Sequence, residues 1–387
     1  MREGLSSLVE NKHLMHNWKE CSLIFATEHR HLFILVGVKR ISFHTLDFSR
    51  MSHRATRRSF LVSATALAGL SLAGCIPDLG AVGSIAGAAV VPPPGYDPVL
   101  LAITNRVAVK AASKSPWYGY ERSQSTSVAQ VTFNRPDTTL VGRARSSLSG
   151  AWTIKSLRPD TGGVSEAIQQ ATAGREILLY THGYKESFES AAISAMELAD
   201  GVGFLGQTML FSWPSRAALL DYGYDRESAL FSRDAFEETL VALLSEGGAS
   251  RVHIVAHSMG TLLATESLRQ IWARHGDAMA GRIGTVVLAS ADIDLDLFSN
   301  ALQRLRTLVP KMTVISSTGD RALEVSRRLA GGVARTGAAS REQLEGLGVR
   351  VVDATDYGGW VALRHDLFLS NEDVRQVVRR SIERGRA

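Results

Sequence analysis

The sequence contains little cysteine and little proline. Of its 387 residues only 2 are cysteine and 10 are proline, whereas 34 are glycine. Two cysteines cannot form a disulfide framework or a multi-cysteine zinc site. The content of 45% hydrophobic and 21% charged residues excludes a disordered, collagen-like or polytopic membrane chain. The composition leaves a globular body, large enough for one α/β domain or two small ones.

The positive charge is confined to one end of the chain. The formal net charge is +5, but residues 1–74 hold ten Lys and Arg against five Asp and Glu. Residues 75–387 therefore hold 33 basic and 33 acidic side chains and are formally neutral. A neutral body gives no electrostatic reason to expect a nucleic-acid partner.

An export signal is predicted after Met51. Three arginines at 54, 57 and 58 precede the apolar run Phe60–Ala73, whose fourteen residues would form ~21 Å of helix, too short for a bilayer. The segment TRRSFL, residues 56–61, resembles a twin-arginine signal, and LAGC, which ends at Cys75, resembles a bacterial lipobox. We therefore expect a lipoprotein that is acylated on Cys75.

These features predict four segments. We expect an over-extended N-terminus at 1–50, a signal peptide at 51–74, a flexible tether at 75–99 and an enzyme-like domain at 100–387. The predicted location is the cell envelope, on the periplasmic side, with the membrane as a partner through lipidated Cys75.

The body alternates short apolar runs with amphipathic stretches. This pattern predicts a mostly parallel central sheet with helices on both faces. Short insertions also predict that there is no large cap domain. The expected strands are 127–133, 138–142, 151–157, 176–181, 207–213, 251–256, 284–289, 311–317 and 349–353, and the expected helices are 187–201, 224–246, 260–275 and 371–384.

Ser258 is the candidate nucleophile. It follows the predicted strand 251–256 and precedes a predicted helix, in the pattern Ala256-x-Ser-x-Gly260. A nucleophile elbow needs small residues two positions before and after its serine, because the strand-to-helix turn is sharp. The alternative is a serine that caps the helix.

The loop after strand 176–181 is expected to complete an oxyanion hole. In folds that carry a nucleophile elbow, this loop and the residue after the nucleophile each supply a backbone N–H. We assign these groups to Tyr184 and Met259. Gly183 would allow close approach of substrate, and His182 would orient the loop rather than act as a base.

The acid and the base should follow the serine in that order. Asp320 comes directly after strand 311–317, and His365 is the only histidine beyond it. Asp292 and Asp294 follow the preceding strand and are the alternative acids. The sequence favours Asp320, because its position suits a Ser-Asp-His arrangement.

Two further segments need interpretation. Trp213 ends the strand at 207–213 and is either a wall of the acyl pocket or a core tryptophan. Residues 201–206 match G-x-G-x-x-G, but in a helix-then-strand setting, the reverse of a dinucleotide-binding loop. We therefore expect no nucleotide cofactor, and no His/Cys spacing indicates a metal.

Residues from about 100 to 380 resemble a largely uncharacterised group of bacterial α/β-hydrolases in the esterase/lipase superfamily. The shared segments are YGYERS (118–123), THGY (181–184), FSWPS (211–215), YDRES (224–228), HSMG (257–260), DID (292–294) and GDRAL (319–323). The resemblance implies the same three catalytic residues, but it names no substrate.

The sequence thus predicts a lipid-anchored serine hydrolase that acts on carboxylic esters through an acyl-enzyme. The alternative is a non-catalytic envelope lipoprotein that uses the hydrolase fold for binding. The sequence does not indicate the oligomeric state.

Overall fold

The structure is a computed structural model. It describes residues 23–28, 31–38, 40–41, 44–45, 98–109, 115–136, 152–218, 221–245, 248–357 and 365–387. The chain divides into two compact units, Met1–Ala86 and Gly87–Ala387. The predicted signal peptide, Cys75 and the strand expected at 138–142 lie outside the described residues.

The described part of the first unit consists of short strands. In it β1 (Leu23–Glu28) pairs antiparallel with β2 (His31–Val38), which also pairs with β3 (Arg40–Ile41) and β4 (His44–Thr45). The residues predicted to be catalytic all belong to the second unit.

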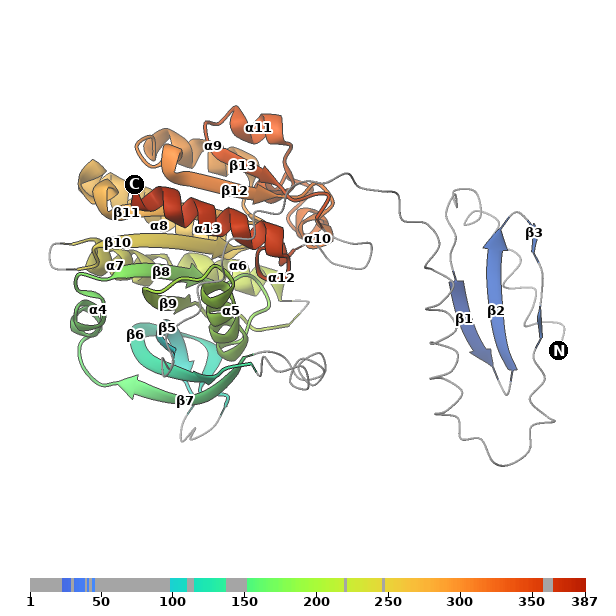
Figure 1. Ribbon diagram of the computed structural model, residues 1–387, viewed down its shortest axis with the longest axis horizontal. Helices are drawn as coiled ribbons and strands as arrows, with labels where there is room; N and C mark the ends of the chain where they lie inside the picture. Colours follow the sequence, from blue (N-terminus) through green and yellow to red (C-terminus); the bar gives the residue numbers. More distant parts are fainter. Residues whose placement is uncertain are drawn as a thin grey trace. The chain divides into compact units, whose positions relative to one another are not determined.

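A nine-stranded sheet forms the centre of the second unit (Figure 1). Its order is β13-β12-β11-β10-β8-β9-β5-β6-β7, and only the β5–β6 and β6–β7 pairs are antiparallel. The strands are β5 (Val99–Ala108), β6 (Tyr118–Asn134), β7 (Thr153–Asp160), β8 (Glu176–Thr181), β9 (Gln207–Ser212), β10 (Arg251–His257), β11 (Ile283–Ala289), β12 (Met312–Ser316) and β13 (Arg350–Asp353). The expected mostly parallel sheet is confirmed.

Strand order reverses at β8. From β8 the chain moves outward to β9, then returns to β10 on the other side of β8 and continues outward through β11, β12 and β13. Ligands bind parallel sheets at such switch points, beyond the carboxyl ends of the strands. The register pairs Thr181 with Ala256, so the residues after β8 and β10 emerge side by side.

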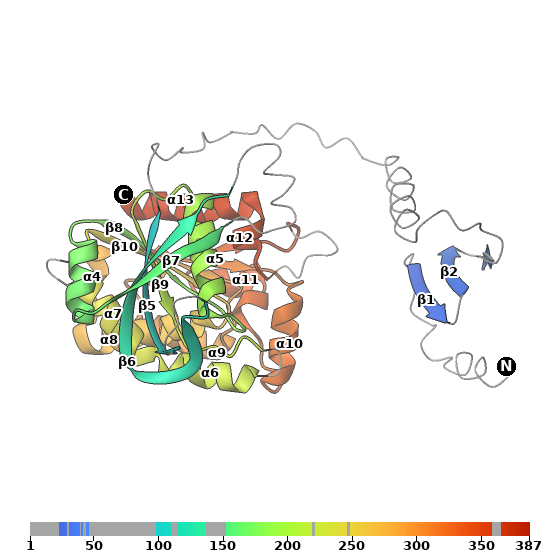
Figure 2. The ribbon, with the colours of Figure 1, turned by 90° about the horizontal axis from the view of Figure 1, so that it is seen from below.

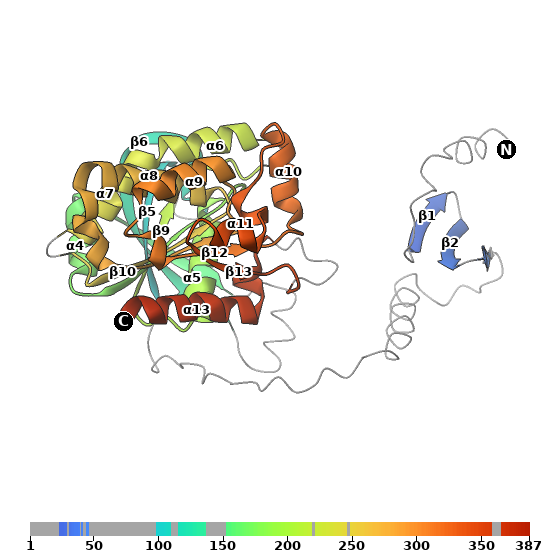
Figure 3. The same ribbon diagram turned by 90° about the horizontal axis from the view of Figure 1, so that it is seen from above.

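Helices cover both faces of the sheet. Figures 2 and 3 show α5 and α13 on one face and α6, α7, α8 and α9 on the other. Each face buries its own apolar cluster against these helices. The helices are α4 (Val164–Thr172), α5 (Phe188–Gly201), α6 (Tyr222–Phe231), α7 (Arg233–Leu244), α8 (Gly260–His275), α9 (Leu295–Arg304), α10 (Arg321–Leu329), α11 (Arg341–Glu345), α12 (Leu367–Ser370) and α13 (Glu372–Arg386), with short 3-10 turns at Gly276–Arg282, Val309–Lys311 and Thr336–Ala338.

The prediction of a single helix at 224–246 is wrong, because the structure divides this segment at Ser232 into α6 and α7. The Ser232 hydroxyl donates to the carbonyl of Ser228 at 2.8 Å and also bonds the side chain of Asn105 in β5. A hydroxyl that bonds nearby backbone and a distant side chain competes with the regular helical ladder.

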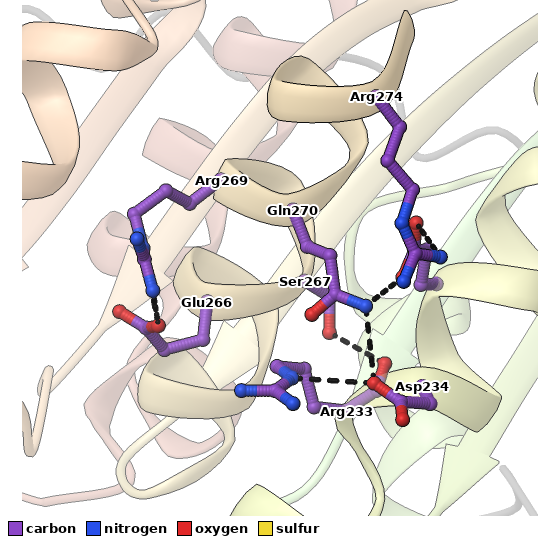
Figure 4. Close-up of polar contacts among 8 residues, drawn as sticks. Arg233, Asp234, Glu266, Ser267, Arg269, Gln270 and Arg274 are labelled. Carbon is purple, nitrogen blue, oxygen red and sulfur yellow. Dashed lines mark hydrogen bonds and ion pairs between the residues drawn. The ribbon is translucent and has the colours of Figure 1, made fainter.

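The amphipathic pattern of 224–246 would place Glu237 on the solvent side of a helix, and the structure does not. Glu237 is buried and accepts hydrogen bonds from Gln270 and Arg274 of α8, with the Arg274 contact at 2.9 Å. Figure 4 shows Gln270 also donating to Asp234 of α7. Nearby, the Ser267 hydroxyl donates to the carbonyl of Arg233. These bonds fix α8, which begins just after Ser258, against α7. None of the helices within the described ranges is long and apolar enough to cross a membrane.

Candidate active site

Ser258 occupies a tight turn between a strand and a helix. β10 ends at His257, α8 begins at Gly260, and Ser258 has a φ of 49°. Few non-glycine residues adopt positive φ, and such strained positions cluster at functional sites. The Ser258 N–H donates to the carbonyl of Ala289 at 2.9 Å, which holds the turn against the end of β11. This is the geometry expected of a nucleophile elbow.

The loop after β8 lies directly against this turn. A Cβ added to Gly183 would lie 2.8 Å from the Cβ of Ser258 and 3.1 Å from Nδ1 of His257. Only glycine therefore permits this approach. Tyr184, the residue after Gly183, and Met259, the residue after Ser258, therefore lie at the same edge of the sheet, beyond the carboxyl ends of β8 and β10.

Asp320 and His365 are joined side chain to side chain. Nδ1 of His365 lies 2.8 Å from Oδ2 of Asp320. The Asp320 side chain is 0% exposed and that of His365 is 20% exposed, so the histidine faces the solvent side of the pair. An ionised carboxylate only accepts hydrogen bonds, so Nδ1 carries the proton and Nε2 is left as the basic nitrogen.

The other oxygen of Asp320 has a structural partner. Oδ1 accepts hydrogen bonds from the N–H groups of Ala322 and Leu323 at 2.9 and 3.1 Å, which caps the start of α10. The carboxylate is thus fixed by the helix on one side and presented to His365 on the other. A fixed carboxylate orients the imidazole ring.

The backbone of His365 is held at the end of β10. Its carbonyl accepts a hydrogen bond from Nε2 of His257 at 3.0 Å and one from the Ser290 hydroxyl at 2.8 Å. The rings of His257 and His365 lie 4.9 Å apart. Because His257 immediately precedes Ser258, these bonds tie His365 to the strand that carries the serine.

His257 and Ser290 were not predicted as site residues. Chain order does not point to His257, because a residue adjacent to Ser258 cannot readily turn to act as its base. Burial, reinforced by the neighbouring His365, lowers the pKa of His257 well below its usual value, so it is neutral at pH 7. Ser290 has a φ of 48°, so it is another strained residue at this edge of the sheet. This backbone conformation is a feature of the structure and not of the sequence pattern.

The alternative acids Asp292 and Asp294 have other partners. Asp292 is buried, lies 3.2 Å from Nε of the buried Arg335, and accepts hydrogen bonds from Tyr222 and Ser326. Asp294 caps α9 by accepting from the N–H of Leu297 at 2.9 Å. Neither carboxylate makes a hydrogen bond or ion pair to His365, so the geometry favours Asp320.

His182 and Trp213 support the loop rather than line an open pocket. Both are 0% exposed, and their rings stack at 4.7 Å. Nδ1 of His182 lies 2.8 Å from the carbonyl of Gly183, and Trp213 Nε1 donates to the carbonyl of His182. Burial, together with nearby Arg106, lowers the pKa of His182 to about 3. Trp213 therefore has the second of its two expected roles, that of a core tryptophan.

Arg106 on β5 connects this loop to the rest of the site. It is buried, and it donates to the Ser212 hydroxyl at 2.9 Å and to the carbonyl of Glu186 at 2.9 Å. Its Nη2 also lies 3.3 Å from Nε2 of His182. Burial lowers the pKa of Arg106 to about 10, which leaves it charged at pH 7. A planar guanidinium suits this role, because it offers several donors in a fixed geometry.

Asp225 on α6 holds the same loop from the other side. Its Oδ2 accepts from the Lys185 N–H at 3.2 Å and from the Ser215 hydroxyl at 2.5 Å. Its Oδ1 accepts from the Arg216 N–H at 2.8 Å. Lys185 has a φ of 67°, so these bonds stabilise a strained residue next to Tyr184. Burial raises the pKa of Asp225.

More than half of the chain matches a known family. Residues 163–381 match the family described as alpha/beta hydrolase of unknown function. The chain belongs to this family. A curated relative from Nostoc sp., itself uncharacterized, is 27% identical over 128 residues, which cover 26% of this chain and 32% of the relative. The chain thus aligns with about a third of that relative's length.

Solved esterase structures show weak similarity to the chain. A Pyrobaculum calidifontis esterase has 14% identity and a TM-score of 0.31, and covers 68% of this chain and 83% of its own. Brefeldin A esterase, described as a bacterial homologue of human hormone sensitive lipase, has 13% identity and a TM-score of 0.34. The match covers 87% of this chain and 88% of that esterase. Est1E from Butyrivibrio proteoclasticus has 10% identity and a TM-score of 0.32, and the match covers 67% of this chain and 95% of Est1E. Similarities at this level say nothing about the substrate of this α/β hydrolase.

Within the described ranges no three His, Cys, Asp or Glu side chains form a group that could hold a metal ion. The polar groups described above lie at the ends of β8, β10 and β11, in the turn before α10 and just before α12. Among the described residues, His365 is bonded to Asp320, His257 and Ser290, and no hydrogen bond joins its side chain to that of Ser258. This set resembles the site of an acyl-transfer enzyme, in which a serine, a histidine and a carboxylate meet at strand ends.

Proposed function

We propose that this α/β hydrolase is a serine hydrolase of carboxylic esters. The observation that carries the proposal is the Asp320–His365 pair, whose histidine is bonded through its carbonyl to His257, the last residue of the strand before Ser258. The strained φ of Ser258 adds support, because an elbow serine is presented to substrate in this conformation.

In the proposed mechanism Nε2 of His365 removes the proton of Ser258 as its oxygen attacks the ester carbonyl. Asp320 holds the imidazole tautomer and stabilises the imidazolium that forms. The backbone N–H groups of Tyr184 and Met259 bind the oxyanion. The tetrahedral intermediate then expels the alcohol, which takes its proton from His365. Water, activated by the same histidine, releases the acid from Ser258.

A fluorophosphonate probe tests the chemistry directly. We expect the probe to label the wild-type chain, and Ser258→Ala to abolish labelling. Ser267→Ala is the matched control, because Ser267 is a buried serine of α8 bonded to α7. Equal labelling of the wild type and Ser258→Ala would refute the serine mechanism and favour a binding protein with a hydrolase fold. A panel of esters of increasing acyl length would then define the substrate.

We also propose that the chain is exported and anchored through acylated Cys75. The support is the order of a basic segment, a short apolar run and the LAGC motif in the sequence. Cys75→Ser should abolish incorporation of labelled palmitate and release the protein from the membrane fraction. Cys21→Ser, which changes the other cysteine, should leave palmitate incorporation and membrane association unchanged. If both variants stay in the membrane fraction, the assignment of Cys75 as the anchor is wrong.

A further inference from the structure

Exposed apolar side chains gather around one edge of the hydrolase domain. Val325 and Leu329 on α10 are 52% and 59% exposed, and Val333 and Leu297 are 40% and 43% exposed. The N–H of Leu295 donates to the carbonyl of Ala334, which places Val333 beside the start of α9. Figures 2 and 3 show α6, α9 and α10 together at this edge. Soluble proteins rarely expose such groups together without a partner.

A groove adjoins this apolar edge. It encloses about 530 Å³ between α6, α8 and α9, and its lining includes Leu230, Leu262 and Leu297. Leu297 thus belongs both to the groove and to the exposed apolar edge. A volume of this size is typical of sites that hold a small ligand or part of a larger one.

Three arginines border the groove and the apolar edge. Arg226 and Arg304 line the groove, and Arg321 lies on α10, four residues before Val325. In the described part of the chain the side chains of these three arginines form no hydrogen bond or ion pair.

Glu266 of the groove lining and Glu324 of α10 are already paired with other arginines. Glu266 is paired with Arg269 at 2.6 Å, on the side of α8 away from α7 (Figure 4). Glu324 is already paired with Arg327 and Arg328. Exposed apolar groups beside arginines that are unpaired in the described ranges are complementary to a bilayer surface, whose interior is apolar and whose headgroups are anionic.

We propose that this α9–α10 surface, formed by Leu297, Val325, Leu329, Val333, Arg226, Arg304 and Arg321, docks on an anionic lipid bilayer. Val325, Leu329 and Val333 enter the interfacial region, and the arginines contact lipid phosphates, with one headgroup at the groove. α10 begins at Arg321, directly after Asp320, and spans ~14 Å, so docking brings the Asp320–His365 pair to within one short helix of the lipid. The proposal does not depend on ester hydrolysis.

Site-specific fluorescence tests the docking without interference from any anchor. In a full chain with Cys21→Ser and Cys75→Ser, an environment-sensitive NBD label is placed at Leu329→Cys. The matched control is Leu205→Cys, because Leu205 is 56% exposed and lies just before β9, at the amino ends of the parallel strands, whereas α10 follows the carboxyl end of β12. Vesicles of phosphatidylcholine with about 30% phosphatidylglycerol should shift the emission to the blue at 329 and not at 205. Equal shifts at both positions, or none at 329, would overturn the proposal.

Charge variants test the arginines. Arg226→Gln and Arg304→Gln should each raise the lipid concentration at half-maximal shift by roughly fivefold. Asp296→Asn, which removes an exposed carboxylate beside Leu297, should lower this lipid concentration. Arg175→Gln, just before β8 at the amino ends of the strands, should leave the lipid concentration unchanged. An emission shift with pure phosphatidylcholine vesicles as large as that with anionic vesicles would overturn the charge-based docking.

Inorganic phosphate separates a lipid headgroup from a free anion. At constant ionic strength it should not compete with vesicles, and full competition would mean a soluble-anion site and overturn the proposal. Turnover of a soluble short-chain ester by Val325→Asp should match the wild type, so loss of docking is distinguishable from loss of catalysis.

Discussion

Nε2 of His257 donates a hydrogen bond to the carbonyl oxygen of His365 at 3.0 Å. A carbonyl only accepts, so this bond fixes His257 as the Nε2–H tautomer. The residue before the candidate nucleophile therefore holds the backbone of the candidate base. His257 acts through His365 and is a positioning residue in the proposed mechanism.

Removing the His257 donor should slow catalysis with little effect on substrate binding. We expect His257→Phe, which keeps a ring but loses the N–H, to lower kcat roughly fivefold, the cost of one neutral hydrogen bond, with KM unchanged. His257→Gln retains a donor at a similar reach and should recover part of the rate. A purely structural role predicts instead that both variants lose stability alike and that neither changes kcat selectively.

The two candidate acids should respond differently to loss of charge. Asp320→Asn leaves an amide beside Nδ1 of His365 and disfavours the productive tautomer, so kcat should fall by about 10⁴-fold. Asp292→Asn leaves the buried Arg335 without its ionic partner. We expect this variant to lose about 3–5 kcal/mol of unfolding free energy while its folded fraction keeps most of its kcat.

Steady-state kinetics and urea unfolding of the two variants distinguish these outcomes. A fall in kcat with Asp292→Asn as large as that with Asp320→Asn would show that the acid assignment is wrong.

Chain order and strand ends are readable from the sequence, which is why Ser258, Asp320 and His365 could be assigned before their geometry was known. Buried parallel strands appear as apolar runs, and their carboxyl ends share one edge of the sheet. Asp292 also follows a strand, so the pattern left it open. The two acids are distinguished by the contact of Asp320 with His365 and by that of Asp292 with Arg335, tertiary pairings that leave no periodic signal.

The supporting residues were missed for the same reason. Arg106 lies on a strand that was not predicted and reaches Glu186, some eighty positions away. The break between α6 and α7 depends on the contact of Ser232 with Asn105, which local helix propensity does not report. His257 was missed because its bond to a backbone carbonyl has no sequence signature.

Gly183 should tolerate no side chain. In Gly183→Ala the new Cβ would lie 2.8 Å from the Cβ of Ser258, so the loop or the serine must shift. A displacement of about 1 Å at a reacting group can cost 10²-fold in rate, and we expect kcat/KM to fall by about that factor. Gly223→Ala in α6 is the control, because a Cβ added there would have nothing within 4 Å of it. Normal ester turnover by Gly183→Ala would remove the loop from the proposed mechanism.

Stability should depend on pH through His182. Burial and Arg106 lower its folded-state pKa to about 3, whereas 6.5 is its ordinary value. As pH falls below 6.5, the unfolded chain therefore binds a proton that the folded chain does not. The contribution of the neutral imidazole is complete above pH 6.5 and is lost progressively toward pH 3.

Replacing His182 should reduce this pH dependence. Between about pH 6 and 5 the slope of unfolding free energy against pH should be smaller in His182→Gln than in the wild type by up to about 1.4 kcal/mol per pH unit. Chemical denaturation at a series of pH values measures the slope. His275→Gln, at the exposed end of α8, is the control and should leave the slope as it is. An unchanged slope in His182→Gln would mean that His182 already accepts a proton in the folded protein, which its contact with the charged Arg106 opposes.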